Sequence, residues 1–231
     1  MKRSTTVLVL AGFFTLFQAN VFAATLSGKA LFTGTAPAAE AIKMDADPKC
    51  KMMHASGVTS DSVIVNSNGT LKNVLVYVKS GVTGKFTAPK DAVVLDQKGC
   101  AYSPKVFGIQ AGQPIRIHNS DDTLHNVHTL SKDNPQFNVG MPIKDMKIEK
   151  KFAKAEPIFK IKCEVHPWMA SYCGVFDHPF YAVTGDDGSF SIKDLPAGTY
   201  TVEAWHEKYG VQTQEITVAG DAGTADFTFK G

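Results

Sequence analysis

Hydrophobic residues occur along this chain in short, often alternating runs, without the sustained three- and four-residue spacing of an amphipathic helix. Gly, Pro, Asn or Asp interrupts the runs about every 8–12 residues, which is typical of a β-sandwich or β-barrel. The pattern therefore predicts an all-β fold. The expected strands are Leu26–Phe32, Val74–Lys79, Ala92–Leu95, Pro114–His118, Lys147–Lys151, Ile158–Cys163, Ser171–Phe176, Ser189–Ile192, Thr199–Trp205 and Gln212–Val218.

The last third of the chain alternates strands with clear turns, at Asp187-Gly188 and at Pro196-Ala197-Gly198. The stretch TGDDGSFSIKDLPAGTYTVEAWHEKYG resembles the carboxypeptidase-regulatory, transthyretin-like β-sandwich. ATLSGKALFTG and LKNVLVYVKSG, nearer the start, resemble the first two strands of the same module. The resemblance implies that both ends of the chain build one sandwich around an inserted middle, because insertions are tolerated at exposed loops. A plain tandem of two domains is the alternative.

The first residues are typical of a secretory signal peptide. A basic start, Lys2 and Arg3, precedes the apolar run Val7–Phe17, and small residues follow up to Ala24. A retained membrane anchor is the alternative, but the run is shorter than the roughly 20 residues that span a bilayer. We expect cleavage near Ala23, a periplasmic location and no membrane insertion afterwards.

The expected division of the chain is a signal peptide (1–23), the first strands of the transthyretin-like sandwich (24–80), a central domain (81–178) and the rest of the sandwich (179–231). The full sequence carries 24 basic and 22 acidic residues. Removing Lys2 and Arg3 leaves 22 of each sign, so bulk charge gives no reason to expect a nucleic-acid partner.

One segment carries the residues of a metal site. His125 follows an Asn-rich turn, and Cys163, His166 and Met169 follow a strand with two residues between each and the next. A thiolate suits Cu(I), imidazole suits both copper states, and a weak thioether completes a set that favours neither strongly. The pattern predicts one copper ion that cycles between Cu(I) and Cu(II).

The stretch from Tyr102 to Val175 resembles the cupredoxins, and most closely the amicyanins, in this short loop and in the upstream sequence HNVH. The resemblance implies a Greek-key β-barrel or sandwich with a type 1 blue copper site, whose ligands would be His125, Cys163, His166 and Met169. This chain departs from the amicyanins at Val165, where they have Pro, and at Trp168, where they have Phe. It also differs in having a second domain, which leaves the redox partner open.

Three functions follow from a mononuclear copper site. An electron carrier is the first, a copper-handling carrier or sensor is the second, and an enzyme with an open copper site is the third. A closed set of two His, one Cys and one Met leaves no position for a substrate, so we expect no enzyme. The expected partner is a redox protein, either a dehydrogenase or a c-type cytochrome.

Residues outside the ligand set have their own expected roles. A Cys50–Cys100 disulfide is preferred, with Cys173 spare, and Cys100–Cys173 is the alternative pairing. Asn126 is expected to brace the two ligand loops, and Asp121 and Asp122 read as turn residues. Met52, Met53 and His54 offer a less favoured second copper site.

The last expectation concerns the surface. The ring edge of His166 should be the most exposed part of the ligand set, because His166 lies on a short loop. Trp168 beside it would then anchor a weak docking surface for the partner. An inward-packed Trp168 that covers the copper is the alternative.

Overall fold

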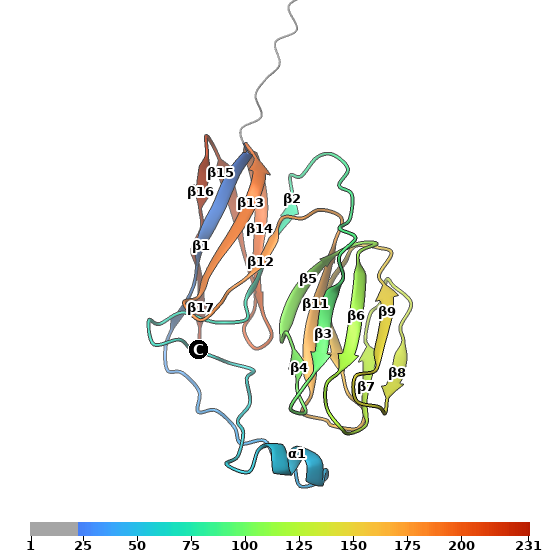
Figure 1. Cartoon of the computed structure of the whole chain (residues 1–231). Helices are drawn as coiled ribbons and strands as arrows, with labels where there is room; N and C mark the ends of the chain where they lie inside the picture. The colour runs from blue at the N-terminus through green and yellow to red at the C-terminus, as the bar shows by residue number, and fades with distance from the viewer. Residues whose placement is uncertain (1–22) are drawn as a thin grey trace, which may run out of the picture.

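The computed structural model describes residues 23–231, and these residues form two β-sandwiches joined side by side (Figure 1). We call them the terminal sandwich, built from both ends of the chain, and the inserted sandwich, built from its middle. Of the predicted signal peptide, only Ala23 falls within the described residues, where it begins β1. No helix among these residues is long and apolar enough to cross a membrane.

The terminal sandwich consists of two sheets. The first sheet contains β13 (Ser189–Pro196), β1 (Ala23–Thr33), β16 (Ala222–Thr224) and β17 (Phe227–Lys230). The second contains, in order, β12 (Tyr181–Val183), β2 (Leu75–Ser80), β14 (Gly198–His206) and β15 (Gly210–Val218). Because β1 pairs with three strands from the last fifth of the chain, the two ends form one unit.

The inserted sandwich also has two sheets. One contains, in order, β5 (Val106–Gln110), β11 (Ala170–Phe176), β10 (Glu156–Lys162), β7 (His125–Thr129) and β8 (Asn138–Met141). The other contains β4 (Tyr102–Ser103), β3 (Val93–Gln97), β6 (Pro114–Asn119) and β9 (Lys147–Lys151). The prediction of an all-β fold with two sandwiches is confirmed.

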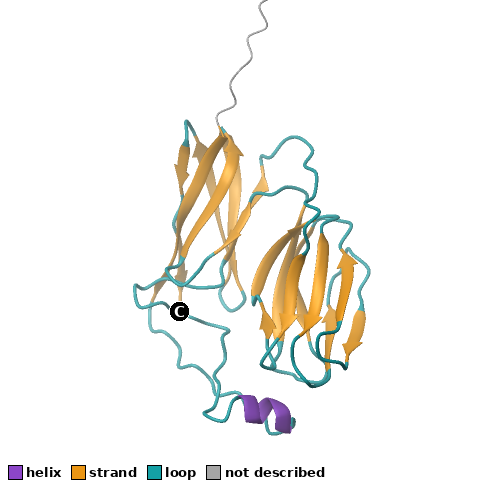
Figure 2. Ribbon diagram, in the orientation of Figure 1, coloured by secondary structure: helices purple, strands orange, loops and turns teal. Residues whose placement is uncertain are grey.

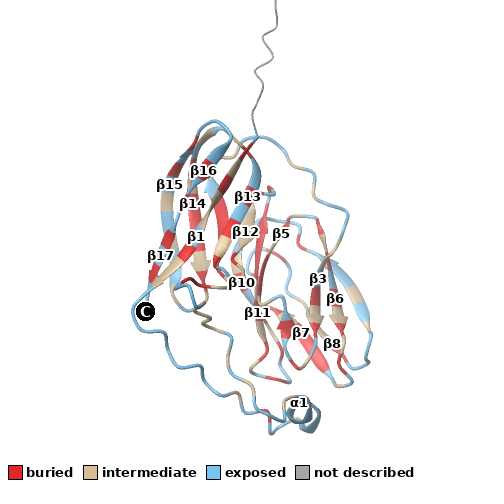
Figure 3. Ribbon diagram, turned by 60° about the vertical axis from the view of Figure 1, so that its left-hand side comes forward, coloured by how far each residue is buried: buried red, intermediate tan, exposed pale blue. Residues whose placement is uncertain are grey.

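Each sandwich has its own apolar core, and buried residues follow the strands of both (Figure 3). Leu26, Phe227 and Phe229 are fully buried in the terminal core, while Ile117 and Ile161 are fully buried in the inserted core. Full burial of one such side chain stabilises the fold by about 1.5–3 kcal/mol. A third, smaller cluster joins the two sandwiches, and it contains Leu75, Tyr77, Val106 and Phe176.

One part of the chain between β1 and β2 leaves the terminal sandwich. It carries a short helix to the lower end of the inserted sandwich (Figures 1 and 2). There its residue Asp47 contacts His166, in the loop that follows β10. We call residues 41–59 the capping segment, because an isolated bridge between Ala41 and Thr59 closes it. Its residues Met44 and Cys50 are buried in the inserted core. The segment thus packs on the inserted sandwich, although residues 24–80 were predicted to serve the terminal one.

The capping segment contains the helix α1 (Pro48–Met53), which the hydrophobic pattern did not predict. Asp47 caps this helix, since its Oδ1 accepts hydrogen bonds from the backbone nitrogens of Lys49 at 2.8 Å and Cys50 at 3.1 Å. Pro48 occupies the first turn, where its missing N–H has no cost. An Asp-Pro pair is a local signal for a helix start, and it was present in the sequence.

Candidate metal centre

Three of the four predicted copper ligands converge at one end of the inserted sandwich. His125 begins β7, Cys163 follows β10, and His166 lies in the loop to β11. One donor atom of each lies within 4.8 Å of the other two. The Nδ1 atoms of the two histidines are 2.9 Å apart, and the Cys163 Sγ is 3.9 Å from the His166 Nδ1. All three side chains are buried.

The fourth predicted ligand lies in the same region. Met169 is buried in the inserted core with Cys163. Its backbone nitrogen donates to the carbonyl of His166 at 2.9 Å, and its carbonyl accepts from the nitrogen of Cys163 at 3.2 Å. These two bonds fold the loop from Cys163 to Met169 into a compact turn, so that one short segment carries three of the predicted ligands.

Asp121 orients the first histidine. Its Oδ2 lies 2.9 Å from the Nε2 of His125, and both side chains are buried. The backbone nitrogens of Gly99 and Cys100 donate to the same carboxylate, each at 2.8 Å. Burial alone would raise the pKa of Asp121, but these bonds lower it below its usual value. The carboxylate is therefore ionised, and it accepts a hydrogen bond from the Nε2–H group of His125.

Asp47 has the same relation to the second histidine. Its Oδ2 lies 2.9 Å from the Nε2 of His166 and accepts a hydrogen bond from the Thr123 Oγ1 at 3.0 Å. Burial would raise the pKa of Asp47, but the bonds from His166, Cys50, Thr123 and Lys49 lower it to about 2. His166 is only 1% exposed. The prediction of an exposed His166 edge is wrong, because the capping segment covers the ring.

The two carboxylates decide which imidazole nitrogens are free. Each neutral imidazole carries one proton, and each Nε2 faces an ionised carboxylate that needs a donor. When both rings are neutral, their protons therefore lie on Nε2, and both Nδ1 lone pairs face each other and the Cys163 sulfur. Two such nitrogens at 2.9 Å need a cation between them, which is either a proton or a metal ion. Soft sulfur with two imidazole nitrogens is a donor set that suits copper, so the residues fit the predicted ion.

The surroundings of the thiol favour its ionised form. Burial would raise the pKa of Cys163, but its interaction with His125 and the backbone N–H groups of Asn126, His166 and Val165 lower it. The His166 nitrogen lies 3.4 Å from the sulfur. Burial would lower the pKa of His125, but Asp121 and Cys163 raise it above its usual value. A thiolate is the form that binds metal.

Asn126 joins the two loops that carry the predicted ligands, as the sequence predicted. Its Oδ1 accepts a hydrogen bond from the Glu164 nitrogen at 2.5 Å, and its Nδ2 donates to Asn138. Tyr102 donates its hydroxyl proton to the Asn126 carbonyl. Since Asn126 follows His125 and Glu164 follows Cys163, this side chain fixes the distance between the two ligand loops.

The Cys50–Cys100 disulfide is confirmed. It connects the capping segment to the loop after β3, and Cys163 and Cys173 are free thiols. The backbone nitrogen of each half-cystine also binds one of the two carboxylates, Cys50 to Asp47 and Cys100 to Asp121. One covalent bond therefore supports both histidines through their carboxylate partners.

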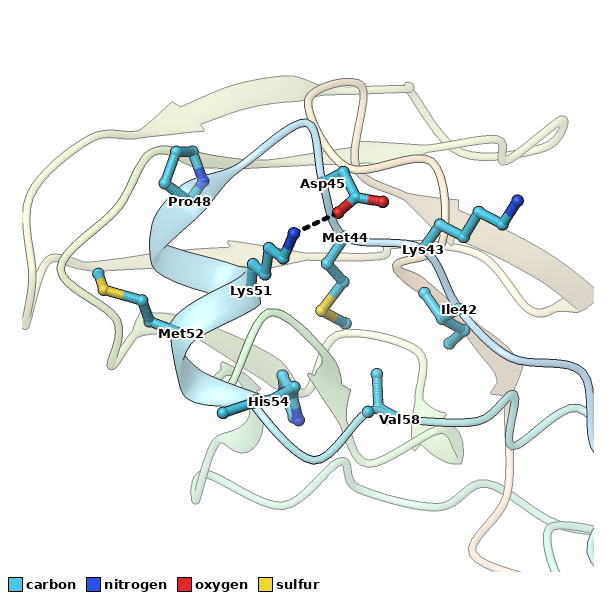
Figure 4. Close-up of a pocket in the computed structure, with 11 residues that line it drawn as sticks. Ile42, Lys43, Met44, Asp45, Pro48, Lys51, Met52, His54 and Val58 are labelled. Atoms are coloured by element: carbon cyan, nitrogen blue, oxygen red, sulfur yellow. Dashed lines mark hydrogen bonds and ion pairs between the residues drawn. The ribbon is translucent and has the colours of Figure 1, made fainter.

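The residues of the less favoured second copper site do not come together. The Nε2 of His54 lies 2.7 Å from the Gly99 carbonyl oxygen. Met52 is 72% exposed, and its side chain points away from His54 (Figure 4). The less favoured second copper site is therefore not assembled.

Trp168 is half-buried, with its ring 5.0 Å from that of His166 and its Nε1 donating to the Cys100 carbonyl. That geometry is the inward-packed alternative.

The sequence interpretation missed two residues of this centre. Asp121 was expected to be a solvated turn residue, but it is buried against His125. Asp47 was not considered, and its contact with His166 joins residues 119 positions apart. A signal existed for Asp121, which stands four residues before His125 in the turn that leads into the ligand strand. The sequence around Asp47 signals only a helix cap.

Three solved structures align with part of this chain. A copper-containing nitrite reductase from Thermus scotoductus SA-01 aligns at 19% identity and a TM-score of 0.35, covering 44% of this chain and 25% of its own. A purple cupredoxin from Nitrosopumilus maritimus aligns at 22% identity and a TM-score of 0.31, covering 37% of this chain and 99% of its own. A reduced amicyanin mutant aligns at 20% identity and a TM-score of 0.33, covering 43% of this chain and 97% of its own. This chain thus spans a quarter of the nitrite reductase and nearly all of the two small proteins.

These TM-scores are low, so the case for a metal centre rests on the geometry described above. Comparison with curated proteins gives no match. The terminal sandwich has a sequence match of its own. Residues 177–230, which contain β12 to β17, match the model of the carboxypeptidase regulatory-like domain.

Proposed function

We propose that this chain is a periplasmic copper protein that carries single electrons between redox partners through one type 1 site. His125, Cys163, His166 and Met169 would hold the ion, and copper would supply one-electron chemistry by alternating between Cu(I) and Cu(II). The observation that carries the proposal is the meeting of the buried Cys163 thiol, whose pKa is lowered, with the Nδ1 atoms of two buried imidazoles. The periplasmic location rests on the predicted signal peptide alone.

The chain's own residues would keep the site rigid. Asp47 and Asp121 fix the histidine tautomers, and Asn126 fixes the spacing of the ligand loops. The His166 N–H to sulfur contact holds the thiolate in place. A site that is held in one geometry needs little rearrangement when the charge of its metal changes, so electron transfer has a low barrier. Such bracing is more useful to an electron carrier than to a protein that must release its metal.

The same closure argues against an enzyme. The histidine rings and the thiol are buried, and the capping segment covers His166. A substrate would need an open coordination position, and a partner protein needs only to come near the site. We therefore propose a redox protein as partner, either a dehydrogenase or a c-type cytochrome, and no catalytic activity.

The experiment is the visible and EPR spectrum of the copper-loaded mature protein. We expect an intense thiolate-to-copper band that Cys163→Ser abolishes, because the thiolate is the most covalent ligand in the set. Cys173→Ala is the matched control, since it removes the other free thiol, which is buried in the same core. The proposal fails if the wild-type protein shows no such band or if Cys163→Ser keeps it. Release of copper on each reduction would favour a copper-handling protein.

A further inference from the structure

The two predicted histidine ligands have carboxylate partners of different origin. Asp121 lies four residues before His125, within the inserted sandwich. Asp47 belongs to the capping segment, which lies between β1 and β2 of the terminal sandwich, and reaches His166 from outside. His166 lies in the loop between β10 and β11, and Asp47 of the capping segment contacts the Nε2 of its ring. The capping segment thus brings a negative charge to a ring that would otherwise meet water.

We infer that Asp47 is a positioning residue of the copper site, which holds His166 in its metal-binding tautomer and favours Cu(II) over Cu(I). The inference deepens the proposed function and rests on it. A carboxylate that accepts the outer N–H of a metal-ligating imidazole fixes the ring and makes the inner nitrogen more basic. A more basic ligand and a nearby negative charge both stabilise the higher charge of Cu(II). The reduction potential is therefore lower than it would be with water at this position.

Several contacts hold the Asp47 carboxylate in one position. Its Oδ1 accepts from two backbone nitrogens of α1, and its Oδ2 accepts from Thr123 and His166. The Lys49 ammonium adds a contact across the same gap, 2.9 Å from the carboxylate of Asp122. The Cys50–Cys100 disulfide then fixes α1 covalently. Four donors and a disulfide are more than a helix cap needs, and together they fix the carboxylate at one point beside His166.

Asp47→Asn is the sharpest variant, since Asn is as good a helix cap as Asp. If the amide oxygen keeps the helix cap, the Nδ2 group faces the Nε2 of His166. Two donors then oppose each other, and His166 must move its proton to Nδ1 and lose the lone pair that faces Cys163. We expect Cu(II) affinity to fall about 10–100-fold, the range seen for partners of metal ligands. If the affinity for Cu(I) falls tenfold less than the affinity for Cu(II), the reduction potential rises by about 59 mV.

Asp45→Asn is the matched control. Asp45 lies in the same capping segment and loses the same charge, but its carboxylate pairs with the exposed Lys51 ammonium at 2.7 Å (Figure 4). A general charge effect would raise both potentials, whereas a positioning role raises only that of Asp47→Asn. Asp47→Ser is the second variant if Asp47→Asn does not fold, because Ser keeps the cap and is too short to bridge to His166. It should raise the potential in the same direction.

The tautomer is measured independently of copper, by ¹⁵N NMR of the histidine rings in the metal-free protein at neutral pH. We expect the His166 proton on Nε2 in the wild type and on Nδ1 in Asp47→Asn. Equal potentials for Asp47→Asn and Asp45→Asn, or a wild-type His166 protonated on Nδ1, would overturn the inference. A wild type without a thiolate-to-copper band contradicts the proposed function instead, and the NMR result then still decides whether Asp47 sets the tautomer.

Discussion

The two sandwiches use their interiors differently. In the terminal sandwich the core is apolar, and few polar residues are buried, among them Glu203 and His206. In the inserted sandwich more polar side chains are buried, and many of them lie at the end that holds the candidate metal centre. These include Gln97, Asn119, Asp121, His125, Asn126, Thr129 and His166. Burial of unpaired polar groups costs about 1–3 kcal/mol each, so such an end is kept only where the groups are bonded or have a function.

Two buried histidines show the difference most clearly. His206, in the terminal sandwich, is stacked on Tyr209, and burial and then Lys105 lower its pKa to about 4. The pKa of His125 is raised, because Asp121 and Cys163 outweigh the effect of burial. The same residue type is thus packed as a neutral ring in one sandwich and placed among charges in the other. Burial alone does not mark a functional histidine, but its charged partners do.

Removal of the Cys50–Cys100 disulfide should have the largest effect, and it should act on only one of the two sandwiches. We expect the Cys50→Ala, Cys100→Ala double variant to lose about 4 kcal/mol of unfolding free energy, since the bond closes a loop of 50 residues. The loss should fall on the inserted sandwich. Differential scanning calorimetry with the copper spectrum as a second probe measures it. An unchanged copper spectrum would contradict the support of both histidines by this bond.

The pH dependence of stability should sharpen the comparison. His206 has a folded pKa of about 4, below its ordinary unfolded value of about 6.5. The unfolded state therefore binds the proton first as pH falls, and stability is lost between about pH 6.5 and 4. The loss is about 3 kcal/mol when complete. Urea unfolding of the metal-free protein over this range measures it.

His206→Phe is the control for that measurement, because Phe keeps the stacked ring and cannot take up a proton. The pKa of His178 is also lowered, by burial, so the wild type carries a second contribution of the same sign. The difference between the wild type and His206→Phe isolates His206. A difference that does not change with pH would show that His206 is not kept neutral by burial.

Asn126→Ala should have the smallest effect on stability and a specific effect on the centre. The change leaves the Glu164 nitrogen without its acceptor, which costs about 1–3 kcal/mol. The ligand loops would lose their spacer, so the EPR lines of the copper-loaded protein should broaden. Asn138→Ala is the control, since it removes the other partner of Asn126 and leaves the Glu164 contact. Equal line widths in the two variants would argue against Asn126 as the spacer.

The strands were predictable where polar and apolar residues alternate. Lys147–Lys151 was predicted with the bounds it has in the structure, and Pro114–His118 ends one residue short of β6. Strands with other patterns were missed. β5 is buried at four of its five positions, so its sequence carries little alternation. The two-residue β4 and the three-residue β12 are too short to form a pattern.

The candidate site was predictable only as far as its residues belong to sequence motifs, which are HNVH for His125 and the loop from Cys163 to Met169 for the other three. The loop from Cys163 to Met169 is local, and its spacing identified it. The contact between Asp47 and His166 depends on the path of a segment that crosses from one sandwich to the other, and no local spacing encodes that path. For the same reason the exposure of His166 was predicted wrongly, since a loop between two strands is exposed unless another segment covers it.

The pairing of β1 also determines the order in which the protein can be completed during synthesis. Lys29 contacts Asp226, which the ribosome adds 197 residues later, and β17 is the last strand of the chain. By contrast, the inserted sandwich and the capping segment are complete once Phe176 has been made. An early strand without its partners is an exposed edge that can pair with other chains, and pairing over such distances is slow. Newly made chains therefore carry every residue of the candidate metal centre while β1 still lacks the strands that pair with it.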